Sequence, residues 1–506
     1  MFYKGFLWGI ASFHGIIYQT KPNKGKLAMS LLSQINLYIQ RAELLNILTV
    51  FSKELINNFA RKNGTLKRQR KVTIAELLSA LLTYASTNQN SNNITFTLNG
   101  FHKCYSDMFG IDISSKALHN RLRSEGLLEV MKNTIENLSM LVKDDTNETG
   151  LKLLEAYRQS VGVNDIIMVD GSEISLRYSA YDNFNCKAKT RNPDKTNPDK
   201  KSAAIKLHTG FSIVNNMPTH IDITEAVANE REHLSPDIYE QVLYLCDRGY
   251  VSEALYLLLI SKGHYFIFRG KENCAYKIIH AMDGNGATLH EFEGCKPCQH
   301  LNGSKYPLVD MAVQVNDDTV LRMIRIYNPV DDKFNYFITN IDASRVAASV
   351  IADTYRTRWS CEIMFKALKS SNSLCSINSS IKEIILLFIY ASIGSYLVKK
   401  LIAKQLQKKK RDDQRKKREI SLLKMASSIR DIGPLLKAMV KGAKSTIYNE
   451  ISKFEGLLDS MMRTKPSQRD IDLKKDVSLL VDKIYNTHHM TKDFLIPHKI
   501  DVTIKA

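Results

Sequence analysis

Tyr355-Arg-Thr-Arg358-Trp-Ser-Cys-Glu362-Ile-Met-Phe-Lys366-Ala-Leu-Lys369 is a stretch in which one carboxylate stands among several cations at helical spacing. At about 100° per residue, four polar side chains share one stripe of a helix: Tyr355, Arg358, Glu362 and Lys369. Three others point the other way, toward a core: Cys361, Met364 and Leu368. The carboxylate suits a divalent cation, and the guanidinium and ammonium groups suit phosphate. The alternative is a solvated helix face with an ion pair such as Glu362 with Lys366.

Two aspartates upstream follow short apolar runs. The first run is Asp165-Ile-Ile-Met-Val-Asp170-Gly171, and the second is Val242-Leu-Tyr-Leu-Cys-Asp247-Arg-Gly249. Such runs are typical of buried strands, and a rigid strand can aim an acid that follows it into a site. Each motif alone also fits a strand that ends in a turn. Phosphoryl transfer through two metal ions needs more than one carboxylate, so Asp170, Asp247 and Glu362 form the candidate set.

These residues resemble the DDE transposases of bacterial insertion sequences, and within them the insertion-sequence-four branch. That branch carries a tyrosine, arginine, glutamate and lysine signature (YREK), and the four side chains of the stripe meet its spacing without a gap. Four shorter motifs agree in order within residues 160–375: Val169-Asp170-Gly171-Ser172, Lys206-Leu207-His208, Asp247-Arg248-Gly249-Tyr250 and Phe268-Arg269-Gly270. Several separate motifs that agree are more specific than any one of them.

The resemblance implies a DNA transposase that cuts and joins DNA at the ends of its element. Asp170, Asp247 and Glu362 would hold two Mg²⁺ ions, or Mn²⁺ in their place. The DNA partners would be the terminal inverted repeats and the target, contacted by Tyr355, Arg358, Lys366, Lys369 and Arg269. The resemblance further implies a cut-and-paste reaction through a hairpin intermediate. A homodimer is also implied, in which each subunit cuts the end that its partner binds.

Two other functions stay open. The chain could be a nuclease of the same fold that only cleaves, or a decayed or domesticated transposase that binds DNA without catalysis; the intact acids count against decay. Relatives often use a tryptophan in a β-rich insertion to cradle a flipped base, but Trp8 and Trp359 both lie outside residues 271–339. Other aromatic side chains could stack on a base or simply fill a core: Tyr327, Phe334, Tyr336 and Phe337.

The apolar runs predict an α/β catalytic core, a ribonuclease-H-like mixed sheet over residues 160–270 and 340–375. The expected elements are a strand at 166–169, a hairpin of 205–213 and 219–224 around Asn215-Asn216, a helix at 236–242, a strand before Asp247, a helix at 252–261 and a strand at 264–268. The helix with Glu362 is expected to begin near Asp342. Short alternating runs between glycines predict a β-rich insertion at 271–339.

The regions that flank this core are expected to be helical. The chain has 506 residues and a formal net charge of +19, which suits a polyanionic partner. Within residues 1–150, a helix-turn-helix over 99–122, capped by Ser115, would present Lys116, Arg121 and Arg123 to DNA; a plain helical hairpin is the alternative. Residues 376–506 would form a basic helical region suited to subunit pairing. The basic runs 67–71, 408–411 and 415–418 track phosphates or are solvated.

Three further features bear on location and cofactors. Residues 1–28 are interpreted as a non-functional upstream extension, because no clear cleavage site follows their apolar run. The apolar residues 384–398 are short for a membrane span, so a buried helix and no membrane partner are expected. Eight cysteines without regular spacing indicate a reducing cytoplasm, here a bacterial one. Cys295-Lys-Pro-Cys298 with His300 is interpreted as an ordinary loop, with a partial zinc site as the alternative.

Overall fold

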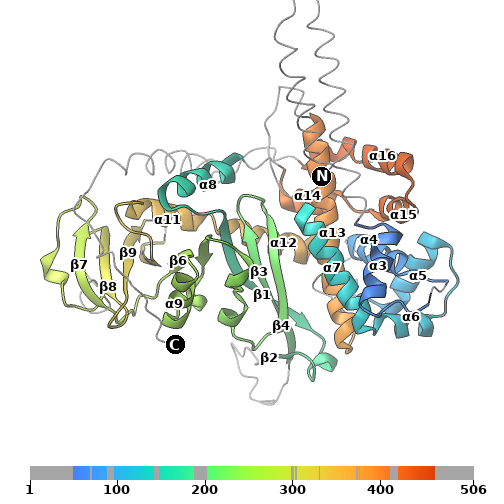
Figure 1. Ribbon diagram of the computed structural model, residues 1–506, viewed down its shortest axis with the longest axis horizontal. Helices are drawn as coiled ribbons and strands as arrows, with labels where there is room; N and C mark the ends of the chain where they lie inside the picture. The colour runs from blue at the N-terminus through green and yellow to red at the C-terminus, as the bar shows by residue number, and fades with distance from the viewer. Residues whose placement is uncertain are drawn as a thin grey trace, which may run out of the picture.

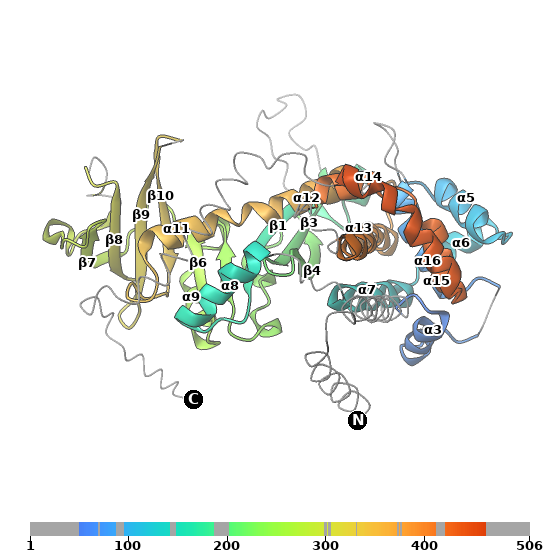
Figure 2. The same cartoon turned by 90° about the horizontal axis from the view of Figure 1, so that it is seen from above.

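A mixed β-sheet and a helical body lie side by side in the computed structural model (Figure 1). The structure describes residues 50–68, 71–87, 96–141, 148–186, 202–297, 301, 305–329, 331–371, 374, 377–410 and 420–461. Figure 2 shows two helices, α11 (Ala348–Arg356) and α12 (Trp359–Ser371), following each other across the sheet toward the helical body. α12 packs on strand β1 and on helices of the body, so it joins the two parts.

Six strands surround the acids. They are β1 (Ile166–Leu176), β2 (Asn185–Cys186), β3 (Ser202–Ser212), β4 (Met217–Glu225), β5 (Leu243–Cys246) and β6 (Tyr265–Arg269). β1 pairs antiparallel with β3 and parallel with β5, β3 pairs antiparallel with β2 and β4, and β5 pairs parallel with β6. The predicted strands and the hairpin are confirmed. The hairpin turns at Asn216, which has a φ of 50°.

Strand β1 runs further than its sequence pattern predicts. Its register with β3 extends from Ile167 opposite Ser212 to Leu176 opposite Ala203. Its register with β5 ends where Val169 lies opposite Cys246. Asp170 therefore lies inside a strand, at the point where the neighbouring strand stops, whereas the prediction placed it just past a strand end. The apolar run stops at Asp170 because only its first residues are buried on both faces, and the pairing with β3 then continues without it.

The predicted β-rich insertion is present, but it extends the same sheet. Its strands are β7 (Lys277–Asp283), β8 (Leu308–Gln314), β9 (Val320–Asn328) and β10 (Lys333–Thr339). β10 pairs antiparallel with β6, and β9, β8 and β7 follow in that order. Among the described residues, ten strands thus form one sheet. The sequence could not predict this junction. Alternation of apolar and polar residues indicates which face of a strand is buried, but it does not indicate which strand pairs with it.

The helix that carries Glu362 differs from the prediction in two ways. It does not begin at Asp342, whose Oδ1 instead accepts from the backbone N–H of Ser344 at 2.7 Å and so closes a tight turn. It is also divided: α11 ends at Arg356 and α12 begins at Trp359. At the division the N–H groups of Thr357 and Arg358 bond to carbonyls three residues back, and the Thr357 hydroxyl also bonds to Thr354 O. Such back-bonding by threonine favours a bend.

The predicted helix at 236–242 is wrong, and the helix at 252–261 is confirmed. Only a single 3₁₀ turn, η4 (Pro236–Ile238), forms in the first segment. It lies between two residues with positive φ, Ser235 at 53° and Gln241 at 46°, which an α-helix cannot contain. Helix α9 (Glu253–Ser261) follows Ser252 and covers the face of the sheet formed by β5 and β6.

The two flanking helical regions pack together as one body. Its N-terminal helices are α3 (Lys53–Lys62), α4 (Ile74–Thr87), α5 (Leu98–Phe109), α6 (Ser115–Leu122) and α7 (Glu125–Leu141). Helix α8 (Glu148–Val161) lies instead beside the sheet, where the Tyr157 hydroxyl is 2.7 Å from the Thr354 hydroxyl of α11 (Figure 1). The C-terminal helices are α13 (Lys382–Lys410), α14 (Leu422–Ser428), α15 (Gly433–Lys441), α16 (Lys444–Lys453) and α17 (Leu458–Met461). α13 packs on α4 and α7, and α15 packs on α4. The pair α5 and α6 confirms the predicted helices, with Ser114 rather than Ser115 as the cap of α6.

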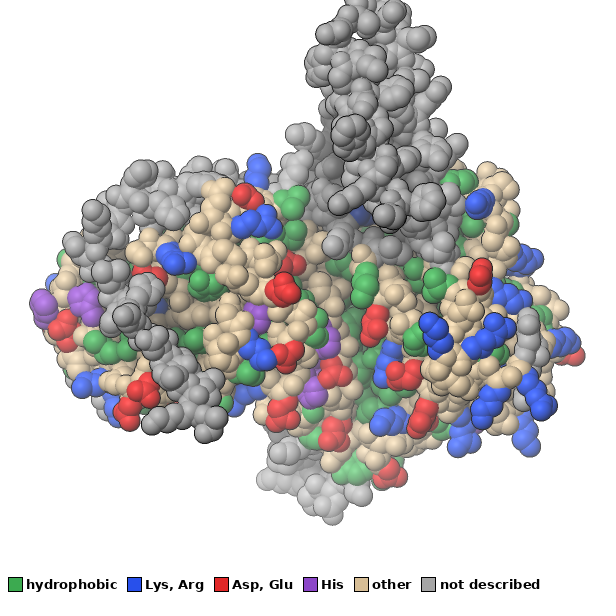
Figure 3. Space-filling view, viewed as in Figure 1, with side chains coloured by type: hydrophobic (Ala, Val, Ile, Leu, Met, Phe, Trp, Pro, Cys, Tyr) green, Lys and Arg blue, Asp and Glu red, His purple; other side chains and the backbone are tan. Residues whose placement is uncertain are grey.

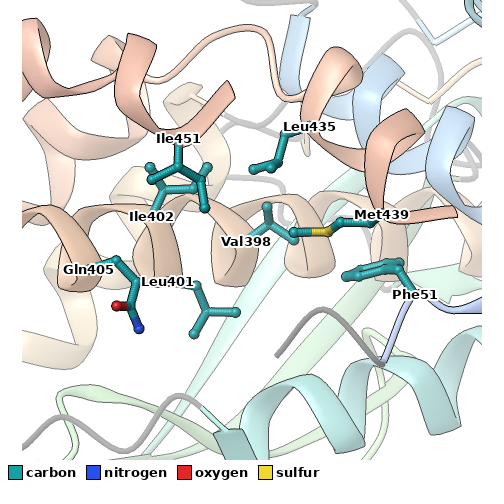
Figure 4. Close-up of a pocket in the computed structure, with 8 residues that line it drawn as sticks. All are labelled: Phe51, Val398, Leu401, Ile402, Gln405, Leu435, Met439 and Ile451. Carbon is teal, nitrogen blue, oxygen red and sulfur yellow. The ribbon is translucent and has the colours of Figure 1, made fainter. Parts of the chain in front are cut away.

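Helix α13 is the centre of this body. It is long and apolar enough to cross a membrane, but 94% of its apolar window is buried inside the protein, as expected for the buried helix predicted at 384–398. Figure 4 shows a small apolar hollow between α13, α15 and α16, lined mainly by Leu, Ile, Val, Met and Phe side chains. The hollow lies away from the acids and carries no polar cluster, so it belongs to the core.

Candidate active site

Arg358 brings two of the predicted acids together. Its Nη1 lies 3.0 Å from Asp170 Oδ2, and its Nη2 donates to Glu362 Oε1 at 2.8 Å. The bend between α11 and α12 places Arg358 opposite β1, while the first turn of α12 presents Glu362 four residues later. One guanidinium therefore bridges a strand acid and a helix acid that are far apart in the sequence.

Tyr355 links the third acid to the same group. Its hydroxyl donates to Asp247 Oδ1 at 3.3 Å, and Arg358 Cζ lies 5.8 Å from the centre of its ring. The ring is buried and packs against Phe337 of β10, with centroids 5.2 Å apart. Asp247 directly follows β5, as predicted, and begins the 3₁₀ turn η5 (Arg248–Tyr250). The structure thus brings Asp170, Asp247 and Glu362 together around Tyr355 and Arg358.

Burial and crowding of charge perturb the acid on β1. Burial raises the pKa of Asp170 to about 6, Arg358 and the N–H of Gly171 oppose that rise, and the nearby carboxylates of Asp247 and Glu362 add to it. Burial acts against the charge on Arg358, but Tyr355 and the three carboxylates raise its pKa above the ordinary value. A strongly perturbed acid held beside two others is typical of a functional site.

An open groove of about 490 Å³ runs along the acids. Its lining residues are Asp170, Gly171, Ser172, Glu362, Phe365, Lys366 and Lys369. Lys366 is exposed at this groove, and Lys369 Nζ donates to the backbone carbonyl of Glu173 at 2.9 Å. Two acids and two lysines thus line the same groove, which suits a phosphodiester strand held beside metal ligands.

Arg269 ends β6, the strand that pairs with β5, and Asp247 directly follows β5. Its Nη2 donates to Asn335 Oδ1 at 2.5 Å, and its Cζ lies 5.8 Å from the ring centre of Phe337. Burial lowers its pKa, while Tyr355 and Asp247 act the other way. Arg269 is therefore a second guanidinium at the site. Trp359, which follows Arg358, has 53% of its surface exposed and begins α12.

The predicted N-terminal DNA contacts lie apart from the acids. Lys116, Arg121 and Arg123 are on α6 or at its end, in the helical body, whereas the acids lie on β1, directly after β5 and on α12 (Figure 1). Lys116 and Arg123 are exposed and Arg121 is half-buried. The basic runs 67–71 and 408–411 fall partly outside the described residues, and residues 1–28, the basic run 415–418, Cys298 and His300 fall wholly outside them.

The carboxylate oxygens are the right ligands for Mg²⁺ or Mn²⁺, but a guanidinium stands between two of them. Within the described ranges, no group of three or more His, Cys, Asp and Glu side chains is spaced to hold a metal ion as it stands. Three carboxylates gathered around one guanidinium offer the hard oxygen ligands that a divalent cation prefers. The donor set therefore fits the ion, provided that Arg358 leaves the space between Asp170 and Glu362.

Sequence reasoning missed Glu230, which lies directly behind the two aspartate motifs. Glu230 Oε1 is 3.1 Å from the place where a Cβ on Gly171 would lie, and its Oε2 is 3.1 Å from the corresponding place on Gly249. Neither glycine has a positive φ. The glycines that follow the aspartates thus serve close packing, whereas the sequence suggested turns. A lone glutamate in a loop offered no signal, because its neighbours come from strands far along the chain.

The segment that contains the three acids is similar to a known family of domains. Residues 162–393, which hold all three acids, match the family described as Transposase DDE domain. A curated relative, "Putative transposase y4zB" of Sinorhizobium fredii, is 21% identical over 206 residues, which are 40% of this chain and 54% of that protein. The chain therefore spans about half the length of the curated relative that it matches.

A solved structure also resembles the chain at low similarity. It is described as "Cryo-EM structure of piggyBac transposase synaptic complex with hairpin DNA", and the match covers 87% of this chain and 85% of that one. The identity is 12% and the TM-score is 0.41. At that score the two chains share too little geometry to define a common fold.

Proposed function

We propose that this protein is a DNA transposase of a bacterial insertion sequence, with a ribonuclease-H-like catalytic core of the insertion-sequence-four branch. The observation that carries the proposal is the cluster of Asp170, Asp247 and Glu362 around Arg358, in a segment similar to transposase DDE domains. The strand order β4-β3-β1-β5-β6, with one acid on β1, one directly after β5 and one on α12, supports the ribonuclease-H-like core.

The chain's own groups would position DNA for phosphoryl transfer. Asp170, Asp247 and Glu362 would hold divalent ions, which when bound activate a water and stabilise the leaving oxygen. Arg358, released from the carboxylates, would turn to the phosphate beside the cut, and Lys366 and Lys369 would follow the strand along the groove. Tyr355 would keep Asp247 oriented through its hydroxyl. The reaction would be cut-and-paste through a hairpin intermediate, in a homodimer in the bacterial cytoplasm.

A joining assay tests this proposal against the other functions. The full-length protein is incubated with Mg²⁺, a duplex that carries the inverted repeats flanking the gene, and a supercoiled target plasmid. A transposase cleaves the duplex at the repeat end and joins a precut end to the plasmid. Cleavage without joining of precut ends would identify a nuclease, and binding without either reaction would identify a DNA-binding protein.

We expect the N-terminal helix pair to bind the element ends. Lys and Arg side chains gather over the end of the molecule that contains α3, α5 and α6 (Figure 3). Replacing Lys116 and Arg123 together with alanine should weaken end binding roughly tenfold. The slope of log Kd against the logarithm of the salt concentration should fall by about the amount expected for two lost phosphate contacts. Cleavage of saturated DNA should stay unchanged, because α6 lies apart from the acids.

The measurement is fluorescence anisotropy with labelled end duplex over a salt series. Lys277→Ala, an exposed lysine on β7, is the matched control and should bind like the wild type. Equal affinity and equal salt slope in the double variant and the wild type would show that α6 does not contact DNA.

A further inference from the structure

A short polar turn lies beside the place where β1 and β5 stop pairing, between Asp170 and Asp247. β5 stops at Cys246 while β1 continues, so the sheet separates between Gly171 and the turn η5. The 3₁₀ turn η3 (Glu230–His233) packs against η5 at this opening. It comes from the loop after β4, a segment with no part in the proposed mechanism.

Glu230 lies on the opposite face of β1 from Arg358. Successive residues of a strand point to opposite faces, so Asp170 and the missing side chain of Gly171 face opposite ways. The burial of the two preceding residues fits this alternation. Met168 lies in the core on the side of α12, and Val169 lies in the core on the side of α9. Asp170 faces Arg358, and the space at Gly171 is closed by Glu230. Glu230 therefore supports the site from behind and does not reach the groove that would hold DNA.

Both oxygens of Glu230 occupy space that the two glycines leave open. A Cβ on Gly171 would lie 3.1 Å from Oε1, and a Cβ on Gly249 would lie 3.1 Å from Oε2. These separations are tighter than ordinary contacts, so an alanine at either position would push the carboxylate away. One side chain thus spans the gap between the strand that carries Asp170 and the turn that follows Asp247.

Other contacts hold η3 to the strands on one side and to η5 on the other. Lys206 Nζ on β3 lies 3.1 Å from Glu230 Oε1, and both side chains are largely covered. Arg231 Nε donates to the carbonyl of Gly249 at 3.2 Å. His233 pairs with Asp222 on β4, and its ring stacks on that of His208 on β3, with centroids 4.4 Å apart. We call Glu230, Arg231 and His233 the η3 clamp.

We propose that the η3 clamp is a positioning device that fixes the spacing between Asp170 and Asp247, with Glu230 as its central residue. The inference rests on the proposed function, because it concerns the same acids. Supporting groups around metal ligands determine how well the ligands are preorganised, and losing one typically costs about 10–100-fold in metal affinity or activity. Glu230 is a positioning residue, since it acts through the backbone beside each aspartate.

The test compares two glutamates of the same turn in the full-length protein bound to end DNA. Glu230→Ala should weaken Mn²⁺ binding, measured by electron paramagnetic resonance of the free ion, at least about tenfold, and should raise the Mg²⁺ concentration for half-maximal cleavage to match. Glu230→Gln keeps the shape and should recover most of the loss. Glu232→Ala, an exposed neighbour whose side chain bonds to Asn229, should behave as the wild type. Melting temperature and DNA affinity should be alike in all variants.

A glycine substitution tests the same contact with Glu230 still in place, so the loss in the single variant is measured without requiring Glu230→Ala to fold. Gly249→Ala should weaken Mn²⁺ binding when Glu230 is present, because the new methyl group meets its carboxylate, and should cost much less in the Glu230→Ala background. Mn²⁺ binding by Glu230→Ala within twofold of the wild type, or additive losses in the double variant, would overturn the clamp. A wild-type protein that neither binds Mn²⁺ nor cleaves DNA would overturn the proposed function itself.

Discussion

Replacing Asp247 with alanine should slow cleavage of end DNA at least about a thousandfold, equivalent to roughly 4 kcal/mol of transition-state stabilisation. Binding of the same DNA should stay within twofold. The reason for the separation is structural: Asp247 begins a short turn and is not among the residues that line the groove. Its carboxylate accepts from the Tyr355 hydroxyl, and the Tyr355 ring packs against Phe337. The variant should therefore lose a metal ligand without losing the surface that holds DNA.

Strand nicking of a labelled duplex and anisotropy on the same duplex measure the two effects. Asp237→Ala is the matched control, since Asp237 is an exposed acid that pairs with Lys262 on the surface. Residual cleavage within tenfold of the wild type would remove Asp247 from the catalytic set. Parallel loss of cleavage and binding would assign it a structural role.

Replacing Arg358 with alanine should lower cleavage about a hundredfold to a thousandfold and yet increase the stabilisation that Mg²⁺ gives to the free protein. The guanidinium lies between Asp170 and Glu362 and is mostly buried, so it takes the position of a cation among the acids. Without it, the metal-free protein should be less stable, by about 1–3 kcal/mol, because the partly buried carboxylates lose their partner. Mg²⁺ would then bind without having to displace the arginine.

Thermal unfolding with and without Mg²⁺, together with the nicking assay, measures this prediction. Arg356→Ala, two residues earlier and mostly exposed beside Asp353, should match the wild type in both. Arg358→Lys should keep part of the stability but little of the cleavage, because an ammonium cannot bridge two carboxylates or grip a phosphate in the same way. A Mg²⁺-induced shift in Arg358→Ala no larger than that of the wild type would mean that the arginine does not compete with the ion.

Local spacing was enough to find the chemistry of the site. Arg358 and Glu362 are four residues apart, so their contact needs only one turn of helix, and the apolar side of the same stretch is buried at Cys361, Met364 and Leu368 as predicted. The strand before Asp247 also follows from its short apolar run. The set of three acids was predicted from their places beside apolar runs and on the helix, together with the number of carboxylates that two metal ions need. The structure brings Asp170, Asp247 and Glu362 together, and their catalytic roles stay predictions.

Contacts between distant parts of the chain decided the features that local patterns could not predict. The continuation of β1 through Asp170 depends on pairing with β3, the joining of the insertion to the core depends on β10 meeting β6, and the single helical body depends on α13 packing between α4 and α7. Glu230 is the clearest case, because its place is defined by two glycines and a lysine from three other parts of the chain. A periodic pattern records which side of an element is buried, whereas its partner is chosen by shape and charge across the folded molecule.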